Sequence, residues 1–85
     1  MSEHAKQKGL LRISAAARAA GVSRQTVEYY VMLGLIEPIR PPEGRARYFD
    51  SNLVRRIRLI RELNESGYTL RAIRETYLQK RRRRK

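Results

Sequence analysis

The segment between Ile13 and Phe49 constrains the fold more than any other part of the chain. An alanine-rich run at 14–20 is followed by Gly21-Val22-Ser23 and then by a second run with helical periodicity. Glycine readily adopts the left-handed backbone angles that end a helix, and serine is a good N-cap for the next one. This order of signals predicts a helix-turn-helix, with one helix over 15–20 capped by Ser14 and a second over 24–33 capped by Ser23.

The residues after the second helix predict a small wing. Three prolines between positions 38 and 42 exclude a helix there. Glu43-Gly44 is a turn signal, and the segments 35–39 and 45–49 on either side of it read as two short strands. The sequence therefore predicts a two-stranded hairpin directly after the helix-turn-helix.

Two further helices complete the predicted domain. Asp50 or Ser51 would cap a helix over 52–66, and Thr69 would cap a last helix with Tyr77 on its buried face. The fold class is mainly α: a winged helix-turn-helix of about four helices over 10–79, between a flexible arm at 1–9 and a basic tail at 80–85. The predicted core is apolar and drawn from all of these elements: Ala16, Val22, Val27, Tyr30, Leu35, Ile36, Val54, Ile57, Ile60, Leu63, Leu70 and Ile73.

Composition excludes several classes of function. The chain has no cysteine, and its one histidine, His4, lies in the polar N-terminal arm. We therefore expect no metal site, no cofactor and no catalytic residues, so the protein should not be an enzyme. No apolar run approaches the ~20 residues of a membrane span, and we expect no signal peptide because the N-terminus lacks its apolar stretch. A cytoplasmic, nucleoid-associated protein without a membrane partner is the expectation.

The net charge of +12 points to a polyanionic partner. The last six residues, 80–85, carry half of that charge, so the remaining body of the chain is basic as well. Double-stranded DNA, RNA and anionic membrane surfaces all attract such a protein. The tail should add affinity for any of them without adding sequence information.

The second helix of the helix-turn-helix has the chemistry of a recognition helix. Arginine can bind guanine bidentately, glutamine can bind adenine, and threonine can contact a thymine methyl or a phosphate. We therefore predict base contacts from Arg24, Gln25 and Thr26. Neighbouring residues of a helix point about 100° apart. Tyr30 is accordingly predicted to pack in the core, while Tyr29 offers its hydroxyl to a phosphate.

Arginines in the wing and in the third helix are predicted to hold the DNA backbone. Arg45 and Arg47 would share one face of the returning wing strand. In the helix over 52–66 we expect Arg55 or Arg58 to reach a phosphate. Part of the helix charge should be neutralised by i, i+4 pairs, namely Arg58 with Glu62 and Arg61 with Glu65.

With these motifs together, the chain resembles the DNA-binding domain of the MerR family over about 11–78. The resemblance rests on Val22-Ser23 before the second helix, on Tyr29-Tyr30, on Gly34-Leu35-Ile36, on Gly44-Arg45-Ala46-Arg47 and on Ser66-Gly67-Tyr68-Thr69-Leu70 with Ile73. It implies a bacterial winged helix-turn-helix that binds operator or promoter DNA, usually as a two-fold dimer. It also implies base contacts from Arg24, Gln25 and Thr26 and phosphate contacts from Tyr29, Arg47 and the third helix. We predict a backbone contact from Ser23 as well.

The chain departs from the family pattern at two positions in the second helix. Glu28 stands where the family usually has arginine, and Val31 stands where it usually has an acidic residue. The Glu28 carboxylate would repel phosphate unless it pairs with Arg24 or accepts from a cytosine amino group. The family usually continues into a long dimerising helix and an effector domain, whereas this chain ends at Lys85. No effector-sensing residues are evident, and a homodimer would have to form on DNA or through the last helix and the tail.

Two alternatives to a sequence-specific transcription regulator are open at this point. One is an architectural or excisionase-like protein that bends DNA with the same fold. The other is a basic RNA- or ribosome-associated protein in which the helix-turn-helix is a scaffold. RNA-binding domains usually display aromatic side chains on an open sheet. The aromatic residues here fall on predicted helices and a narrow wing, which favours DNA.

Overall fold

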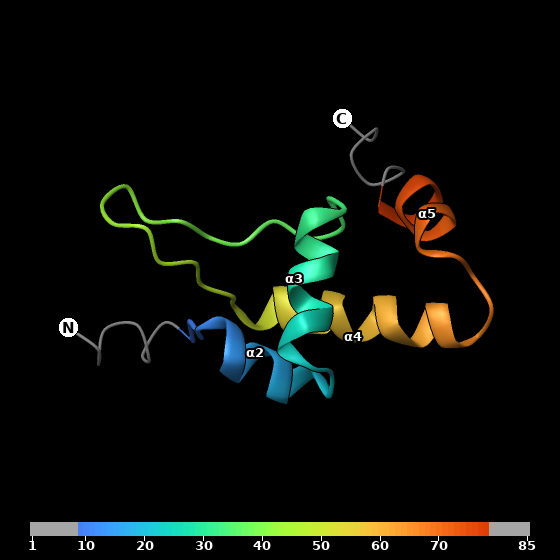
Figure 1. Cartoon of the computed structure of the whole chain (residues 1–85), viewed down its shortest axis with the longest axis horizontal. Helices are drawn as coiled ribbons and strands as arrows, with labels where there is room; N and C mark the ends of the chain where they lie inside the picture. The colour runs from blue at the N-terminus through green and yellow to red at the C-terminus, as the bar shows by residue number, and fades with distance from the viewer. Residues whose placement is uncertain (1–8, 79–85) are drawn as a thin grey trace.

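The computed structural model describes the backbone of residues 9–78 and the side chains of residues 9–76. The predicted burial of Tyr77, most of the predicted arm at 1–9 and the predicted tail at 80–85 lie outside the described residues. The helices follow in the order α2 (Ile13–Ala20), α3 (Arg24–Met32), α4 (Ser51–Glu65), α5 (Leu70–Ile73) and a π-helical turn, η1 (Arg74–Leu78). In Figure 1, α3 runs across the direction of α2 and α4. The loop after α3 and helix α5 extend to opposite sides.

Helix α2 begins earlier than the sequence suggests. The Arg12 carbonyl accepts the first helical hydrogen bond from the amide of Ala16 at 2.9 Å, so Arg12 is the N-cap residue, without a side-chain cap. The prediction that Ser14 caps this helix is therefore wrong, because Ser14 is an exposed residue within its first turn. Ile13 is buried in the core, and its burial is consistent with a helix that starts two residues before the predicted start at position 15.

The turn between α2 and α3 follows the predicted chemistry. Gly21 has φ +77°, in the left-handed region, and the Val22 amide donates to the Ala17 carbonyl at 3.0 Å. Ser23 then caps α3, since its Oγ accepts from the Thr26 amide at 3.0 Å. The helix-turn-helix is thus confirmed, with α3 ending at Met32, one residue before the expected end.

The predicted two-stranded wing is not formed. Instead, the described residues show two isolated antiparallel bridges, Ile39 with Tyr48 and Leu11 with Phe49. Prolines at 41 and 42 have no amide hydrogen, so a ladder cannot extend from the first bridge toward the tip of the loop. The segment 40–47 is therefore an extended loop pinned at its base, which Figure 1 shows projecting from the helices. We refer to this segment as the wing loop.

The two remaining helices begin at predicted caps. Asp50 Oδ1 accepts from the Leu53 amide at 2.9 Å, and Thr69 Oγ1 accepts from the Ala72 amide at 3.0 Å. Helix α5 keeps α-helical geometry for four residues before it widens into η1. Nothing in the sequence pattern predicted that change. None of the helices in the described part of the chain is long and apolar enough to cross a membrane.

The core lies where α2, α3 and α4 meet, with α5 packed against α4. Most of the predicted core residues are buried, although Val22, Leu63 and Leu70 pack against the core while remaining partly exposed. The core also contains Phe49, which is fully buried and was assigned from sequence to a wing strand. The buried apolar residues are Ile13, Ala16, Ala17, Ala20, Val27, Tyr30, Leu35, Ile36, Phe49, Val54, Ile57, Ile60 and Ile73.

Candidate nucleic-acid interface

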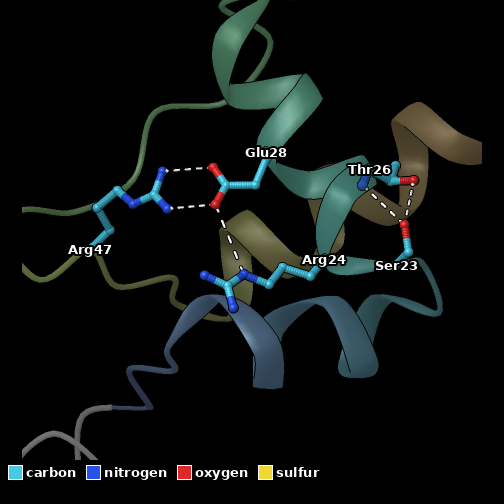
Figure 2. Close-up of polar contacts among 5 residues, drawn as sticks. All are labelled: Ser23, Arg24, Thr26, Glu28 and Arg47. Atoms are coloured by element: carbon cyan, nitrogen blue, oxygen red, sulfur yellow. Dashed lines mark hydrogen bonds and ion pairs between the residues drawn. The ribbon is translucent and has the colours of Figure 1, made fainter.

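The first turn of α3 lies at the protein surface, directly after the helix-turn-helix turn. Ser23, Arg24 and Gln25 are exposed, and Thr26 is half-buried. Ser23 Oγ and Thr26 Oγ1 lie 2.9 Å apart and share a hydrogen bond, in addition to the capping bond from the Thr26 amide (Figure 2). Arg24 and Gln25 therefore project into solvent, while the Thr26 hydroxyl is engaged within the helix start.

A three-residue ionic cluster joins α3 to the wing loop. Arg47 donates from Nη1 and Nη2 to the two carboxylate oxygens of Glu28 at 3.1 and 3.0 Å, a bidentate pair. Arg24, one turn earlier on α3, approaches the same carboxylate, with Nε 3.9 Å from Oε2 (Figure 2). The sequence suggested Arg24 as the partner of Glu28, but the closer partner is Arg47.

This cluster shifts the pKa values of both members of the bidentate pair. The hydrogen bond from Arg47 lowers the pKa of Glu28 below its ordinary value, and the charges of Arg47 and Arg24 act in the same direction. The same bond raises the pKa of Arg47. The Glu28 side chain is 41% exposed and that of Arg47 is 25% exposed, so solvent and ions still reach the pair. Both groups are charged at neutral pH.

Tyr48, directly after the wing loop, contacts the residue that precedes α2. The Arg12 guanidinium lies over the ring of Tyr48, 5.7 Å from its centroid, in a cation–π contact. Arg45 is exposed near the tip of the loop. Arg12 thus adds a positive charge at the base of the wing that sequence reasoning did not assign, because no local pattern relates residues so far apart.

The two tyrosines of α3 divide as the helical geometry requires. Tyr30 is 5% exposed and Tyr29 is 47% exposed. Burial raises the pKa of the Tyr30 hydroxyl, with the nearby charge of Arg61 opposing that effect. Tyr29 borders two hollows of about 370 and 500 Å³, which Leu70 of α5 also lines. Its contact with a phosphate stays a prediction.

The arginines of α4 are held by short-range and long-range hydrogen bonds. Arg55 donates to Asn52 Oδ1 at 2.8 Å, and Arg61 pairs with Glu65 at 3.2 Å as predicted. The predicted pair between Arg58 and Glu62 is wrong: Arg58 donates from Nη2 to the Ala19 carbonyl at 2.9 Å and so ties α4 to the last turn of α2. A guanidinium has five N–H donors, so both Arg55 and Arg58 retain donors for a further partner.

The candidate interface is made of side chains from α3 and the wing loop. The structure brings Arg24 and Arg47 together through Glu28 and leaves Gln25, Tyr29 and Arg45 exposed. Among the residues that the structure describes, no group of three or more acidic, histidine or cysteine side chains could hold a metal ion. The chemistry of the surface is that of guanidinium, amide and hydroxyl donors, which match phosphate oxygens and base edges.

Comparison with known proteins agrees with this interpretation. The profile of the family described as "MerR HTH family regulatory protein" matches residues 11–80. The mercuric resistance operon regulatory protein of Bacillus cereus is 40% identical over 63 residues, which cover 73% of this chain and 47% of that protein. The HTH-type transcriptional regulator CueR of Bacillus subtilis (strain 168) is 38% identical over 64 residues, covering 75% of this chain and 44% of that protein.

A third similar protein is the heavy metal-dependent transcription regulator 2 of Rhizobium meliloti (strain 1021). It is 31% identical over 65 residues, which cover 76% of this chain and 44% of that protein. The matched part of the chain thus spans less than half the length of each of these three regulators. No solved structure matches the chain significantly. The profile match covers most of the chain and agrees with the helix-turn-helix described above, so the chain belongs to the MerR family of helix-turn-helix regulatory proteins.

Proposed function

We propose that this chain binds double-stranded DNA in a sequence-specific manner and regulates transcription. The observation that carries the proposal is the exposed first turn of α3, which presents Arg24 and Gln25 at the end of a helix-turn-helix turn fixed by Gly21 and Ser23. In helix-turn-helix proteins this end of the second helix reads the major groove. Membership of a family of regulatory proteins supports the same conclusion.

The base contacts in this proposal come from three consecutive residues. Arg24 would bind guanine through its guanidinium, and Gln25 would bind adenine through its amide. Thr26 shares its hydroxyl with Ser23, so the free part of its side chain is the methyl group, which suits a thymine methyl. Each good bidentate contact is worth about 1–3 kcal/mol of discrimination against the wrong base.

The backbone contacts in this proposal surround the first turn of α3. The wing loop contributes Arg45 and Arg47, and α4 contributes Arg55 and Arg58. Within the helix-turn-helix, Ser23 at the N-terminus of α3 and the hydroxyl of Tyr29 would contribute too. Two copies would bind together where the recognised site is an inverted repeat, since a two-fold site requires a two-fold protein.

The architectural and RNA-binding alternatives have less support. The aromatic side chains of the described residues lie on α3, at the base of the wing loop or, for Tyr68, in the exposed connection between α4 and α5. None lies on an open sheet of the kind that stacks RNA bases. A protein that only bends DNA would need no particular base contacts. Selection from random DNA therefore distinguishes it from a sequence-specific regulator.

The first experiment is selection of bound duplexes from random double-stranded DNA at near-physiological salt. We expect one motif with wild-type protein and a motif relaxed at one or more positions with Arg24→Ala. Arg71→Ala is the matched control, because Arg71 is also exposed and paired with a glutamate four residues on, but lies on α5. Its motif should equal that of wild type. Recovery of no motif by wild-type protein would refute sequence-specific recognition and favour the architectural alternative.

Removal of residues 80–85 tests the purely electrostatic part of the proposal. These residues lie outside the described part of the structure, and the prediction rests on their six positive charges alone. The truncated chain should bind all duplexes more weakly, with a shallower salt dependence and an unchanged motif. A changed motif after truncation would contradict the assignment of base recognition to α3.

A further inference from the structure

We propose that Glu28 is a specificity-determining residue, which holds Arg47 of the wing loop against α3 and thereby suppresses binding to arbitrary DNA relative to the preferred sequence. The proposal rests on the DNA-binding function proposed above and concerns how strongly that site discriminates between sequences. Its basis is the cluster of Glu28, Arg47 and Arg24 at the junction of α3 and the wing loop (Figure 2).

The bidentate geometry fixes the orientation of the Arg47 guanidinium. Nη1 and Nη2 each give one hydrogen to the Glu28 carboxylate, so the Nε–H and one outer hydrogen on each Nη remain available. With a quarter of its side chain exposed, Arg47 can keep the bond to Glu28 and still offer this second edge to a phosphate. The wing loop is thereby attached to the recognition helix before DNA arrives, which reduces the entropy lost on specific binding.

The same carboxylate lowers the positive charge of the surface where the DNA would lie. Two guanidinium groups and one carboxylate leave the cluster with a single net positive charge. Binding to arbitrary duplex depends mainly on the number of phosphates that cations neutralise, whereas specific binding depends on fixed geometry. Glu28 therefore weakens binding to arbitrary duplex and supports binding to the preferred sequence. Both effects raise the ratio of specific to non-specific affinity.

The test uses the full chain and compares wild type with Glu28→Gln, which keeps the shape of the side chain and removes its charge. Binding to a duplex of arbitrary sequence is measured over a series of potassium chloride concentrations. Removing the carboxylate charge leaves the cluster with one more net positive charge to neutralise a phosphate. This should steepen the slope of log K against log salt by about 0.9 and tighten binding about fivefold or more near 0.1 M salt. Thermal unfolding of each variant verifies that it folds.

The matched control is Glu75→Gln. Glu75 of η1 pairs with Arg71 of α5 at 3.3 Å. The substitution therefore removes the same charge and also frees an arginine, on the opposite side of the helices from the wing loop (Figure 1). Its salt slope should remain within error of wild type. A second variant combines Glu28→Gln with Arg47→Gln and so removes one negative and one positive charge. Its salt slope should return to that of wild type, because the net charge of the cluster is then unchanged.

The same variants are then measured on the duplex motif recovered by selection. Glu28→Gln should gain less affinity for that motif than for arbitrary DNA, so its specificity ratio should fall several-fold. An unchanged slope and ratio in Glu28→Gln, or an equal change in Glu75→Gln, would overturn the role of Glu28 while leaving the DNA-binding function standing. A wild-type chain that bound no duplex at any salt concentration would refute the proposed function itself, and the role of Glu28 with it.

Discussion

Leu11 and Phe49 exchange both of their backbone hydrogen bonds, with N–O distances of 2.9 and 2.8 Å. This pair joins the segment that leads into α2 to the residue that precedes the cap of α4. It also turns the Phe49 side chain into the core, where it is fully buried. The base of the wing loop is thus anchored by one aromatic side chain together with a two-bond backbone bridge.

Truncating Phe49 should therefore destabilise the whole domain. Phe49→Ala leaves a large cavity in a small core, and such substitutions cost about 3–5 kcal/mol of unfolding free energy. Urea unfolding monitored by circular dichroism measures the loss. Met32→Ala is the control, because Met32 is 72% exposed and its truncation should change the free energy by about 0.5 kcal/mol or less. Equal effects of the two substitutions would contradict the assigned core.

The two serines near the helix starts should respond in opposite ways to alanine. Ser23→Ala removes the cap of α3, whose Oγ accepts from the Thr26 amide, and should cost about 0.5–2 kcal/mol. Ser14→Ala should be neutral or stabilising by about 0.5 kcal/mol, because Ser14 is an exposed residue within α2 and alanine is the better helix former. Thermal unfolding of both variants measures these changes in stability. A larger loss of stability with Ser14→Ala than with Ser23→Ala would indicate that Ser14 caps α2 after all.

Local sequence signals predicted most of the helices and most of the core. The caps at Ser23 and Thr69 were predicted, and Asp50 was one of the two candidates for α4, because a cap and its helix are adjacent in the chain. The apolar residues of α4 were found because their spacing has the period of a helix. Ser14 misled the prediction because a good capping residue can also lie inside a helix when burial of a neighbour, here Ile13, sets the helix start.

Local sequence signals could not predict contacts between residues that are far apart in the sequence. The pair of Glu28 with Arg47 spans 19 positions, and the bond from Arg58 to the Ala19 carbonyl spans 39. Several arginines could satisfy each acceptor by charge alone, so composition does not select one. The same limit explains the candidate site: its arginines were identified by type and position, while the partners that orient them depend on how the helices pack.

Burial of the Tyr30 side chain should make stability depend on alkaline pH. Burial raises its pKa above the ordinary 10.0. The contribution to stability is complete below 10.0 and is lost as the pH rises toward the folded-state value, because the unfolded chain ionises first. The free energy of unfolding in urea is measured at about pH 8 and about pH 11. Between these pH values Tyr30→Phe should lose less stability than wild type, because it lacks the hydroxyl that ionises. Tyr29→Phe, at the exposed neighbouring position, should retain the alkaline loss of wild type.

The pair of Glu28 and Arg47 should stabilise the protein at neutral pH and cease to do so in acid. The pKa of Glu28 is lowered from its ordinary 4.5, chiefly by the hydrogen bond from Arg47. Its contribution to stability is therefore complete above pH 4.5 and is lost as the pH falls through the lower folded-state value.

A double-mutant cycle of Glu28→Gln and Arg47→Gln, measured by urea unfolding, isolates the coupling between the two side chains. That coupling should be favourable at about pH 7 and should shrink as the pH falls below 4.5 and the carboxyl group takes up its proton. A coupling that is unchanged in acid would mean that the two side chains interact by packing, and it would remove the electrostatic basis for the role of Glu28 at the DNA surface.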